Sequence, residues 1–376
     1  MTTPCRVLVL NERDLRHPLA GGAELHVTEI FRRLQERGYD VTLAATSFEG
    51  GATEEIVDGI RVRRLGGLAS YYPRVAWTCA RETRRGDFDV VVECLNKVPF
   101  FSPVYSGVPV LALCHHLFGE VAFRQVAWPI AATVWTAERL IPPLYRGLPF
   151  ITISESSRDD LIARGIPGAD IRVSHCGVEP TLAKVDVDRV RPQRVAYMGR
   201  LAAYKRVDVM LHAMAQLSDR FPEAEILVIG RGAARPDLER LASELGLADR
   251  IRFTGFVTDE ERDALLAECR VCVCASEKEG WGLTVIESNR VGTPVVASDA
   301  PGLRDSVRDG RTGLLATYAD VDAFADAIGR LLGDDDLALR MSQEALAWSA
   351  HFDWDRAASE MSEAIDAARR TPRRRR

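Results

Sequence analysis

The stretch VCVCASEKEGWGLTVIES, residues 271–288, contains the unit from which the whole fold is predicted. Its first part alternates valine with cysteine, as in a buried β-strand, where free cysteine packs as a small apolar side chain. Three charged residues and a Gly-Trp-Gly turn follow, and a helix is expected to begin near Leu283. Cys269, Cys272 and Cys274 could also suggest a metal site, but no second Cys/His cluster supplies the remaining ligands. The stretch therefore predicts a strand, a polar glycine-rich loop and a helix.

The same alternation of short β-branched runs and amphipathic segments extends in both directions along the chain. Val27, Ile30, Phe31 and Leu34 form one apolar stripe with helical spacing, which predicts a helix over 23–37. Alternating strands and helices are typical of βαβ units and a parallel sheet. Strands are predicted at 6–11, 40–45, 60–65, 89–94, 109–115, 150–154 and 171–176, and then at 194–199, 225–230, 251–255, 271–276, 294–299 and 313–316.

The chain has 376 residues, which is too long for a typical single hydrophobic core, so two domains are expected. The alternation stops in the polar stretch 181–193, which we interpret as a linker. We therefore predict an α/β fold of two doubly wound, Rossmann-like domains, 1–180 and 194–352, that face each other across a cleft. Residues 353–370 are expected to form a last helix and 371–376 a basic tail.

The composition, with 47% hydrophobic and 27% charged residues, is that of a globular protein. No apolar run is long enough to span a bilayer and the N-terminus lacks a secretory pattern, so we expect a cytoplasmic protein with reduced cysteines. The net charge of −5 argues against a nucleic-acid partner. The ending RRTPRRRR departs from this balance: it could contact anionic lipid at the cytoplasmic face of a membrane, or it could be a solvated tail.

Open parallel sheets bind ligands at the carboxyl ends of their strands, so the residues after each strand are site candidates. Gly21 and Gly22 follow the first strand and precede a helix, where free N–H groups and the helix dipole suit a phosphate; a plain tight turn has the same sequence. They do not form the G-x-G-x-x-G dinucleotide fingerprint. His115 and His116 end a buried strand, and because pleating directs them to opposite faces, only one is expected to face the cleft.

Arg200 and Lys205 lie around a short loop between a strand and a helix. Two cations at one place would stabilise a diphosphate, and especially the charge that develops on a departing one. They could instead belong to a solvated helix start. Positive charge near a helix N-terminus opposes the helix dipole, however, which favours the presence of a ligand.

Glu279 and Glu287 are separated by seven residues within the quoted stretch, the first after the strand and the second on the expected exposed side of the helix. Carboxylates accept hydrogen bonds from sugar hydroxyls. The spacing suits one acid for a hexose and one for a ribose, with a phosphate bound between them by loop amides. No Asp-x-Asp motif stands at a strand end, and residues 334–336 are interpreted as a solvated helix cap, so no metal is predicted.

These motifs together resemble the retaining glycosyltransferases of family four, which have the GT-B fold. The E-x7-E signature of that family matches EGWGLTVIE, its GRL…K motif matches GRLAAYK, its first glycine-rich loop matches GGAE, and its histidine after the fifth strand matches His115, with His116 as the alternative. TISESSRDDL and ASDAPGLRDSVRDGRTGLL also resemble family segments, with Pro301 in place of a common glycine. FDWDRAASEM resembles the closing helix that packs back on the first domain. SHCGVEP departs from the pattern, because Cys176 stands where the family often has asparagine.

The resemblance implies that the second domain binds a nucleotide-diphosphate sugar, UDP- or GDP-linked, as donor. Glu287 would hold the ribose, Glu279 the sugar, Arg200 and Lys205 the leaving diphosphate, and His115 would bond the donor sugar near its reacting carbon. A hexose would then be transferred with retention by front-face attack, in which the leaving phosphate accepts the proton of the acceptor, without cofactor or metal. The other donor-binding residues implied are Gly21, Gly22, Gly199, Trp281, Gly282, Leu283 and Thr284.

The acceptor, a glycan, a lipid-linked molecule or a small molecule, would bind the first domain. Trp128 and Trp135, with the arginine tail, could form an amphipathic surface for a hydrophobic acceptor, or they could pack in the core. Two alternatives keep the architecture: a nucleotide-sugar epimerase and a non-catalytic nucleotide-sugar binding protein. A nicotinamide dehydrogenase is disfavoured by the missing fingerprint. The acceptor-binding candidates are His116, Asn96 and Glu155.

Overall fold

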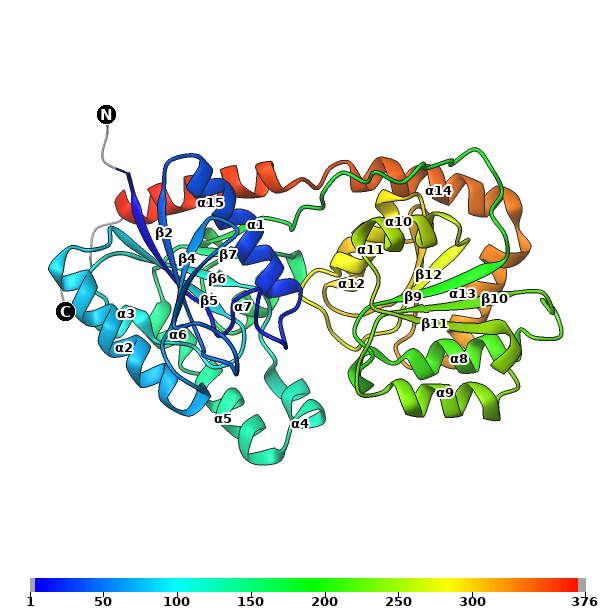
Figure 1. Cartoon of the computed structure of the whole chain (residues 1–376), viewed down its shortest axis with the longest axis horizontal. Helices are drawn as coiled ribbons and strands as arrows, with labels where there is room; N and C mark the ends of the chain where they lie inside the picture. Colours follow the sequence, from blue (N-terminus) through cyan, green and yellow to red (C-terminus); the bar gives the residue numbers. More distant parts are fainter. Residues whose placement is uncertain (1–3, 371–376) are drawn as a thin grey trace. The chain divides into compact units, whose positions relative to one another are not determined.

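The computed structural model describes residues 4–370, so the predicted basic tail, 371–376, lies outside the described residues. The chain divides into two compact units, Met1–Gly177 with Trp354–Arg376, and Val178–Asp353. Each unit is a predominantly parallel sheet with helices on its faces (Figure 1). The predicted architecture of two Rossmann-like α/β domains is confirmed.

The first unit contains an eight-stranded sheet in the order β3-β4-β2-β1-β5-β6-β7-β8. Every neighbouring pair is parallel except β3 with β4. The central strands are buried on both faces, which explains why they read as continuous apolar runs. Its strands are β1 (Arg6–Leu10), β2 (Asp40–Ala45), β3 (Glu54–Val57), β4 (Ile60–Arg64), β5 (Val90–Leu95), β6 (Val110–Cys114), β7 (Phe150–Thr152) and β8 (Ile171–Val173).

Strand β3 is absent from the predicted set, and its sequence explains the omission. It lies at the edge of the sheet, its sequence is EEIV, and its isoleucine, Ile56, is exposed. A polar edge strand of four residues carries no apolar run and no clear alternation. It is held in place by antiparallel pairing with β4, a contact that the local pattern does not encode.

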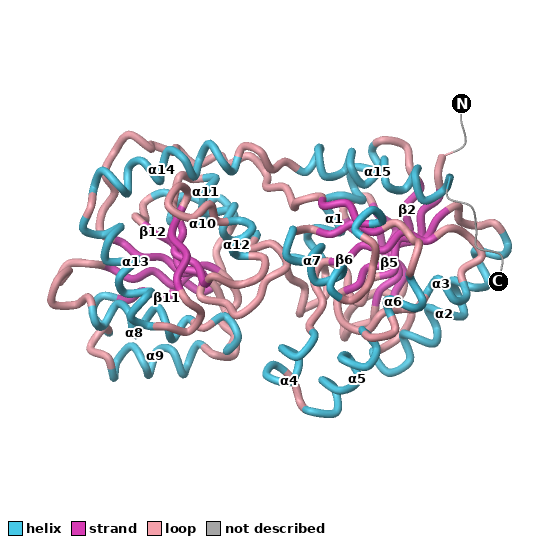
Figure 2. Tube along the Cα trace, turned by 180° about the vertical axis from the view of Figure 1, so that it is seen from behind, coloured by secondary structure: helices cyan, strands magenta, loops and turns pink. Residues whose placement is uncertain are grey.

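The last helix of the chain, α15, packs against α1 within the first unit, and Figures 1 and 2 show the two side by side from opposite directions. Arg37 after α1 pairs with Asp355 at 2.9 Å, and a hydrogen bond of 2.7 Å joins Tyr39 to Ser362. The expected closing helix is therefore confirmed. Helices of this unit are α1 (Gly22–Glu36), α2 (Leu68–Arg85), α3 (Ser102–Tyr105), α4 (Ala122–Gln125), α5 (Trp128–Glu138), α6 (Ile141–Tyr145), α7 (Glu155–Ala163) and α15 (Trp354–Arg370), with 3₁₀ turns η1 (Gly119–Val121) and η2 (Gly168–Asp170).

The second unit has a six-stranded parallel sheet in the order β11-β10-β9-β12-β13-β14. All of its strands were predicted: β9 (Arg194–Met198), β10 (Glu225–Ile229), β11 (Ile251–Gly255), β12 (Val271–Cys274), β13 (Val295–Ser298) and β14 (Gly313–Ala316). Its helices are α8 (Val207–Gln216), α9 (Arg235–Glu244), α10 (Asp259–Ala267), α11 (Leu283–Arg290), α12 (Leu303–Ser306), α13 (Val321–Gly333) and α14 (Asp335–Ser349), with 3₁₀ turns η3 (Ala203–Lys205) and η4 (Ala248–Arg250).

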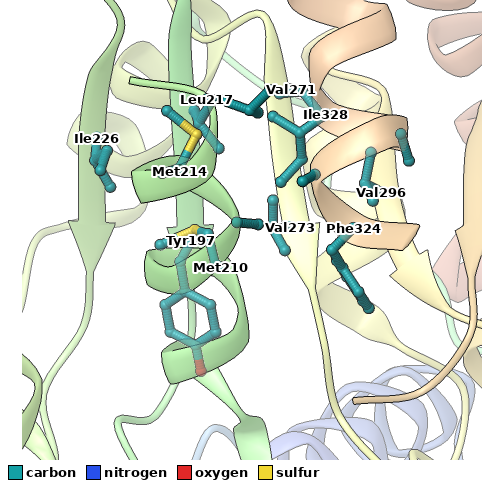
Figure 3. Close-up of a cluster of buried hydrophobic side chains, with 14 of the residues drawn as sticks. Tyr197, Met210, Met214, Leu217, Ile226, Val271, Val273, Val296, Phe324 and Ile328 are labelled. Atoms are coloured by element: carbon teal, nitrogen blue, oxygen red, sulfur yellow. The ribbon is translucent and has the colours of Figure 1, made fainter. Parts of the chain in front are cut away.

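The core of this unit lies between the sheet and helices α8 and α13. Figure 3 shows Met210 and Met214 of α8 and Phe324 of α13 packed over Val273 of β12. The cysteines of β12 are buried and free, as the strand interpretation requires. The stretch 181–193 has no helix or strand and belongs to this unit, where Arg191 donates hydrogen bonds of 2.7 Å to Val291 and Thr293.

Three further predictions concern polar caps, exposed aromatics and membrane spans. Asp334 caps α14 by accepting a hydrogen bond of 2.9 Å from the Leu337 N–H, so the helix-cap interpretation is confirmed. Trp128 is 72% exposed, which excludes core packing for this residue, whereas Trp135 is half-buried. None of the helices between residues 4 and 370 combines the length and the apolar composition that crossing a bilayer requires.

Candidate active site

The second unit has a topological switch point between β9 and β12, because the chain fills one side of the sheet before β12 returns to pair with β9. Open α/β sheets bind ligands outside the carboxyl ends of strands at such a point. The loops that leave β9 and β12 contain Gly199, Arg200 and Lys205 on one side and Glu279 on the other. The topology therefore brings the predicted cations and the first predicted carboxylate to the same edge of one sheet.

Lys205 and Glu279 form an ion pair across this switch point. Lys205 Nζ lies 2.5 Å from Glu279 Oε1, and the two side chains are only 16% and 21% exposed. Burial lowers the pKa of Lys205, but the adjacent carboxylate outweighs it, so the net pKa lies above the usual value. Arg200 also follows β9, but its side chain is exposed. The two predicted cations thus have different surroundings.

The N-terminus of α11 lies in the same loop as Glu279. Gly282 caps the helix in the left-handed region, with φ of 81°. Trp281 is buried edge-to-face against Phe352 at 5.2 Å, so only its backbone is available to a ligand. Leu283 and Thr284 begin the helix, where N–H groups have no intrahelical acceptor. This part of the site can bind an anion through backbone amides and the helix dipole.

The loop after β13 fixes the backbone of Glu279. The Glu279 N–H donates a hydrogen bond of 3.0 Å to the carbonyl oxygen of Pro301. A Cβ on Gly302 would lie 2.2 Å from the carbonyl oxygen of Glu279, and Gly302 has a φ of +82°. Only glycine satisfies both the close approach and the backbone angle.

We expect Gly302→Ala to reduce the catalytic rate of the protein by about 10²-fold, because a shift of the 279–282 backbone misplaces the site. Gly310→Ala is the matched control, since Gly310 has a φ of +73° and open space around its Cβ position. Both variants carry backbone strain of about 1–3 kcal/mol, measured as the free energy of unfolding in urea. Equal catalytic rates in the two variants would show that the contact with Glu279 does not matter for activity.

Glu287 lies on α11 and is only 16% exposed, less than the exposed position that the sequence suggested. Arg262 of α10 donates a hydrogen bond of 3.2 Å from Nη1 to Glu287 Oε1. Burial raises the pKa of Glu287, and the guanidinium groups of Arg262 and Arg290 oppose that increase. The second predicted carboxylate therefore also has a cationic hydrogen-bond partner, which lies 25 residues away in the sequence.

The first unit has its own switch point, between β1 and β5. Asn96 after β5 donates a hydrogen bond of 2.7 Å to the side-chain oxygen of Asn11 after β1. Next to it, Lys97 pairs with Glu12 at 2.7 Å. Asn96, predicted to contact the acceptor, is thus at the ligand-binding edge of this sheet.

The paired glycines lie at the start of α1, at the same edge. Gly21 is the N-cap, and its N–H donates a hydrogen bond of 2.7 Å to Glu24, the acid of a capping box. The amide of Gly21 is therefore already engaged. Gly22, the first residue of the helix, has no partner for its N–H among the residues that the structure describes.

His115 and His116, which follow β6, differ in their burial and in their contacts. His115 is 2% exposed, and its Nε2 lies 3.1 Å from Nδ1 of His26 on α1. Burial lowers the pKa of both imidazoles, that of His26 to about 3. His116 is partly exposed and packs near Phe118. The sequence reasoning did not find His26; its only signal is a position next to the apolar stripe of α1.

Glu155 and Cys176 are the two remaining residues that the sequence singled out in the first unit. Glu155 begins α7, and a hydrogen bond of 3.1 Å to His175 lowers the pKa of its carboxyl. Cys176 is buried, and burial raises the pKa of its thiol.

Within residues 4–370 no group of three or more His, Cys, Asp or Glu side chains is arranged so that it could hold a metal ion.

Comparison with known proteins gives matches over nearly the whole chain. The model of Glycosyltransferase Family 4 matches residues 20–182 and that of Glycosyl transferases group 1 matches residues 182–348. A D-inositol 3-phosphate glycosyltransferase of Streptomyces griseus is 37% identical over 95% of this chain and 86% of its own length.

Solved structures show the same fold. Sucrose-phosphate synthase of Thermosynechococcus elongatus superposes with a TM-score of 0.80 at 23% identity, over 96% of this chain and 98% of that one. The Anabaena protein HepE in complex with UDP-glucose superposes with a TM-score of 0.75 at 20% identity, over 96% and 99% of the two chains. The chain therefore belongs to glycosyltransferase family 4 and is a glycosyltransferase with the GT-B fold.

Proposed function

We propose that the protein transfers a hexose from a nucleotide-diphosphate sugar to a hydroxyl group with retention of configuration. The observation that carries the proposal is the Lys205–Glu279 pair at the switch point of the second unit. An ammonium group and a carboxylate, both mostly buried, provide binding groups for a phosphate and for sugar hydroxyls at one place. Glu287 on α11 adds a second carboxylate to the same βα unit.

The donor would bind along this βα unit. Glu287 would accept hydrogen bonds from the two ribose hydroxyls, and the first amides of α11 would bind the diphosphate at the helix N-terminus. Glu279 would accept hydrogen bonds from the hexose. Lys205 and the exposed Arg200 would stabilise the negative charge that develops on the diphosphate as it leaves.

Transfer with retention needs no protein nucleophile in this proposal. The bond between the anomeric carbon and the phosphate oxygen breaks, and the acceptor oxygen forms its new bond on the same face of the sugar. The acceptor proton passes to the departing phosphate oxygen, so the charge of the leaving group is reduced as the new bond forms. Lys205 and Arg200 stabilise the charge that remains.

The acceptor would bind at the ligand-binding edge of the first unit. Asn96 supplies an amide, His116 a partly exposed imidazole, and Glu155 an exposed carboxylate. His115 has a buried Nδ1 without a hydrogen-bond partner among the described residues, which makes that atom a candidate partner for a hydroxyl of the donor sugar. The relatives are named for acceptors such as D-inositol 3-phosphate, so we propose a polyhydroxylated acceptor.

The test begins with a thermal-shift panel of nucleotide sugars. We expect stabilisation by at least one UDP- or GDP-linked hexose, and the loss of that shift in Glu287→Ala, because a ligand that binds the folded state raises its unfolding temperature. With the active donor and a polyol panel, NMR of the product should show the anomeric configuration of the donor. An inverted product would overturn the retaining mechanism, and an epimerised donor formed without acceptor would indicate an epimerase.

A further inference from the structure

A network of charged side chains joins α10 to α11 next to Glu287. Arg262 donates hydrogen bonds to Glu287 at 3.2 Å, to Asp259 at 2.7 Å and to Asp263 at 3.0 Å. Arg290 donates two hydrogen bonds of 2.6 Å to the same Asp263. The side chain of Asp263 is nearly fully buried, so the two arginines share a buried anion between the helices.

We propose that Arg262 is a positioning residue that holds the Glu287 carboxylate ionised and oriented so that it can accept the ribose hydroxyls of the donor. This inference rests on the proposed function, because it assigns a supporting residue to the donor site described above.

The contacts of Glu287 provide the geometric argument. Its Oε1 accepts a hydrogen bond from Arg262, whereas Oε2 has no hydrogen-bond partner in the part of the chain that the structure describes. One oxygen is thereby fixed, and the other remains available to a ligand. A carboxylate held on one side by a guanidinium can still accept two hydrogen bonds, since each of its oxygens has two lone pairs.

Arg262 is itself held in place by the groups around it. Asp263 binds the Nε and Nη2 groups of Arg262, and it also accepts a hydrogen bond of 2.7 Å from Thr181. Asp259 binds Nη1, the same nitrogen that binds Glu287. Five of the groups in this network lie on the two adjacent helices α10 and α11, so the position of the guanidinium does not depend on a bound donor.

Electrostatics gives the second argument. Burial disfavours an ionised carboxylate at Glu287, and a protonated acid would lose hydrogen-bond acceptor capacity for the ribose. The charged groups that bear on Glu287 are Arg262 and Arg290, which favour ionisation, and Asp259 and Asp263, which oppose it. Of the two arginines, only Arg262 donates a hydrogen bond to Glu287 within residues 4–370.

The experiment compares the pH dependence of kcat/KM for the donor in the wild-type protein, Arg262→Gln and Asp259→Asn at low ionic strength. We expect the acid limb to move to higher pH by about one unit in Arg262→Gln, because a neighbouring opposite charge is lost. In Asp259→Asn the limb should move to lower pH by a smaller amount, since Asp259 is mostly exposed. At neutral pH, Arg262→Gln should raise the donor KM about tenfold with little change in kcat.

Arg240→Gln is the control, because it removes the same charge from an exposed pair on α9 and should leave both limb and KM unchanged. A merely structural role of Arg262 predicts lower stability without a shifted limb. If Glu287→Gln loses donor affinity while Arg262→Gln keeps the wild-type limb and KM, the inference about Arg262 is wrong and the donor site stands. If Glu287→Gln binds donor like the wild type, the proposed donor site itself is wrong.

Discussion

Replacing Lys205 by methionine is expected to lower kcat by about 10²–10³-fold, with a smaller change in the donor KM. Methionine has nearly the length of lysine but no charge, so the loss concerns the ammonium group. In the proposed reaction that group acts mainly when charge develops on the leaving diphosphate, and an interaction stronger in the transition state than in the ground state changes kcat.

A second explanation for such a loss is that Lys205 only neutralises Glu279, whose carboxylate it contacts at 2.5 Å. The two roles separate in a double-mutant cycle with Glu279→Gln. If Lys205 stabilises the leaving group, Lys205→Met still lowers kcat by about 10²-fold when residue 279 is already neutral. If its role is only to neutralise Glu279, the second substitution has little further effect.

The matched control is Lys184→Met, which removes an exposed lysine from the same unit and should retain wild-type kcat. Donor binding by Lys205→Met, measured by the thermal shift, shows whether the site is still formed. A variant that binds donor normally and transfers sugar at the wild-type rate would contradict the assigned role of Lys205.

The strands and the loops of the site could be predicted because short local patterns in the sequence indicate them. In β12 the alternation of valine and cysteine marks a strand buried on both faces, and the glycines around Trp281 mark the turn into α11. The polar edge strand β3 was missed because its pairing with β4, rather than its own pattern, makes it a strand.

The partners of the functional groups were not predictable in the same way. Glu279 and Lys205 are 74 residues apart in sequence, and His115 and His26 are 89 apart. Periodicity and motif spacing describe neighbours within one element, whereas these pairs form where strand order brings separate elements together. The low exposure of Glu287 has a similar origin, because Arg262 of the neighbouring helix α10 contacts it.

The second large effect is expected in the acid stability of the first unit, which should decrease as the pH falls from 7 towards 4. His26 and His115 are buried and lie 3.1 Å apart, with Trp354 of α15 against His26. Neither His26 Nε2 nor His115 Nδ1 has a hydrogen-bond partner in the described part of the chain, so a charged imidazole would be poorly solvated there.

The direction follows from the pKa values of the folded and unfolded states. In the unfolded chain a histidine has a pKa near 6.5, and in the fold burial lowers the pKa of His26 to about 3 and that of His115 well below the usual value. Between these values the unfolded chain binds more protons than the folded protein. The contribution of the two neutral imidazoles to the free energy of unfolding is fully present above about pH 6.5. Below that pH it falls by up to about 1.4 kcal/mol per pH unit for each histidine.

Buried carboxyls such as Glu93 act in the opposite direction, because burial raises their pKa values in the fold. The measurement is therefore a difference between the wild type and the double variant His26→Leu/His115→Leu. Samples are equilibrated in urea at each pH and then pulse-labelled by hydrogen exchange at one common pH, and peptides of α1 and β6 report the unfolding of the first unit. The wild type should lose more stability between pH 7 and 5 than the double variant, whereas His351→Leu, which removes an exposed histidine of the other unit, should follow the wild type. Equal losses in the wild type and the double variant would mean that the imidazole pair takes up no proton on unfolding, and that the acid sensitivity of the unit comes from other groups, such as Asp89, whose pKa is lowered by the hydrogen bond from Arg6.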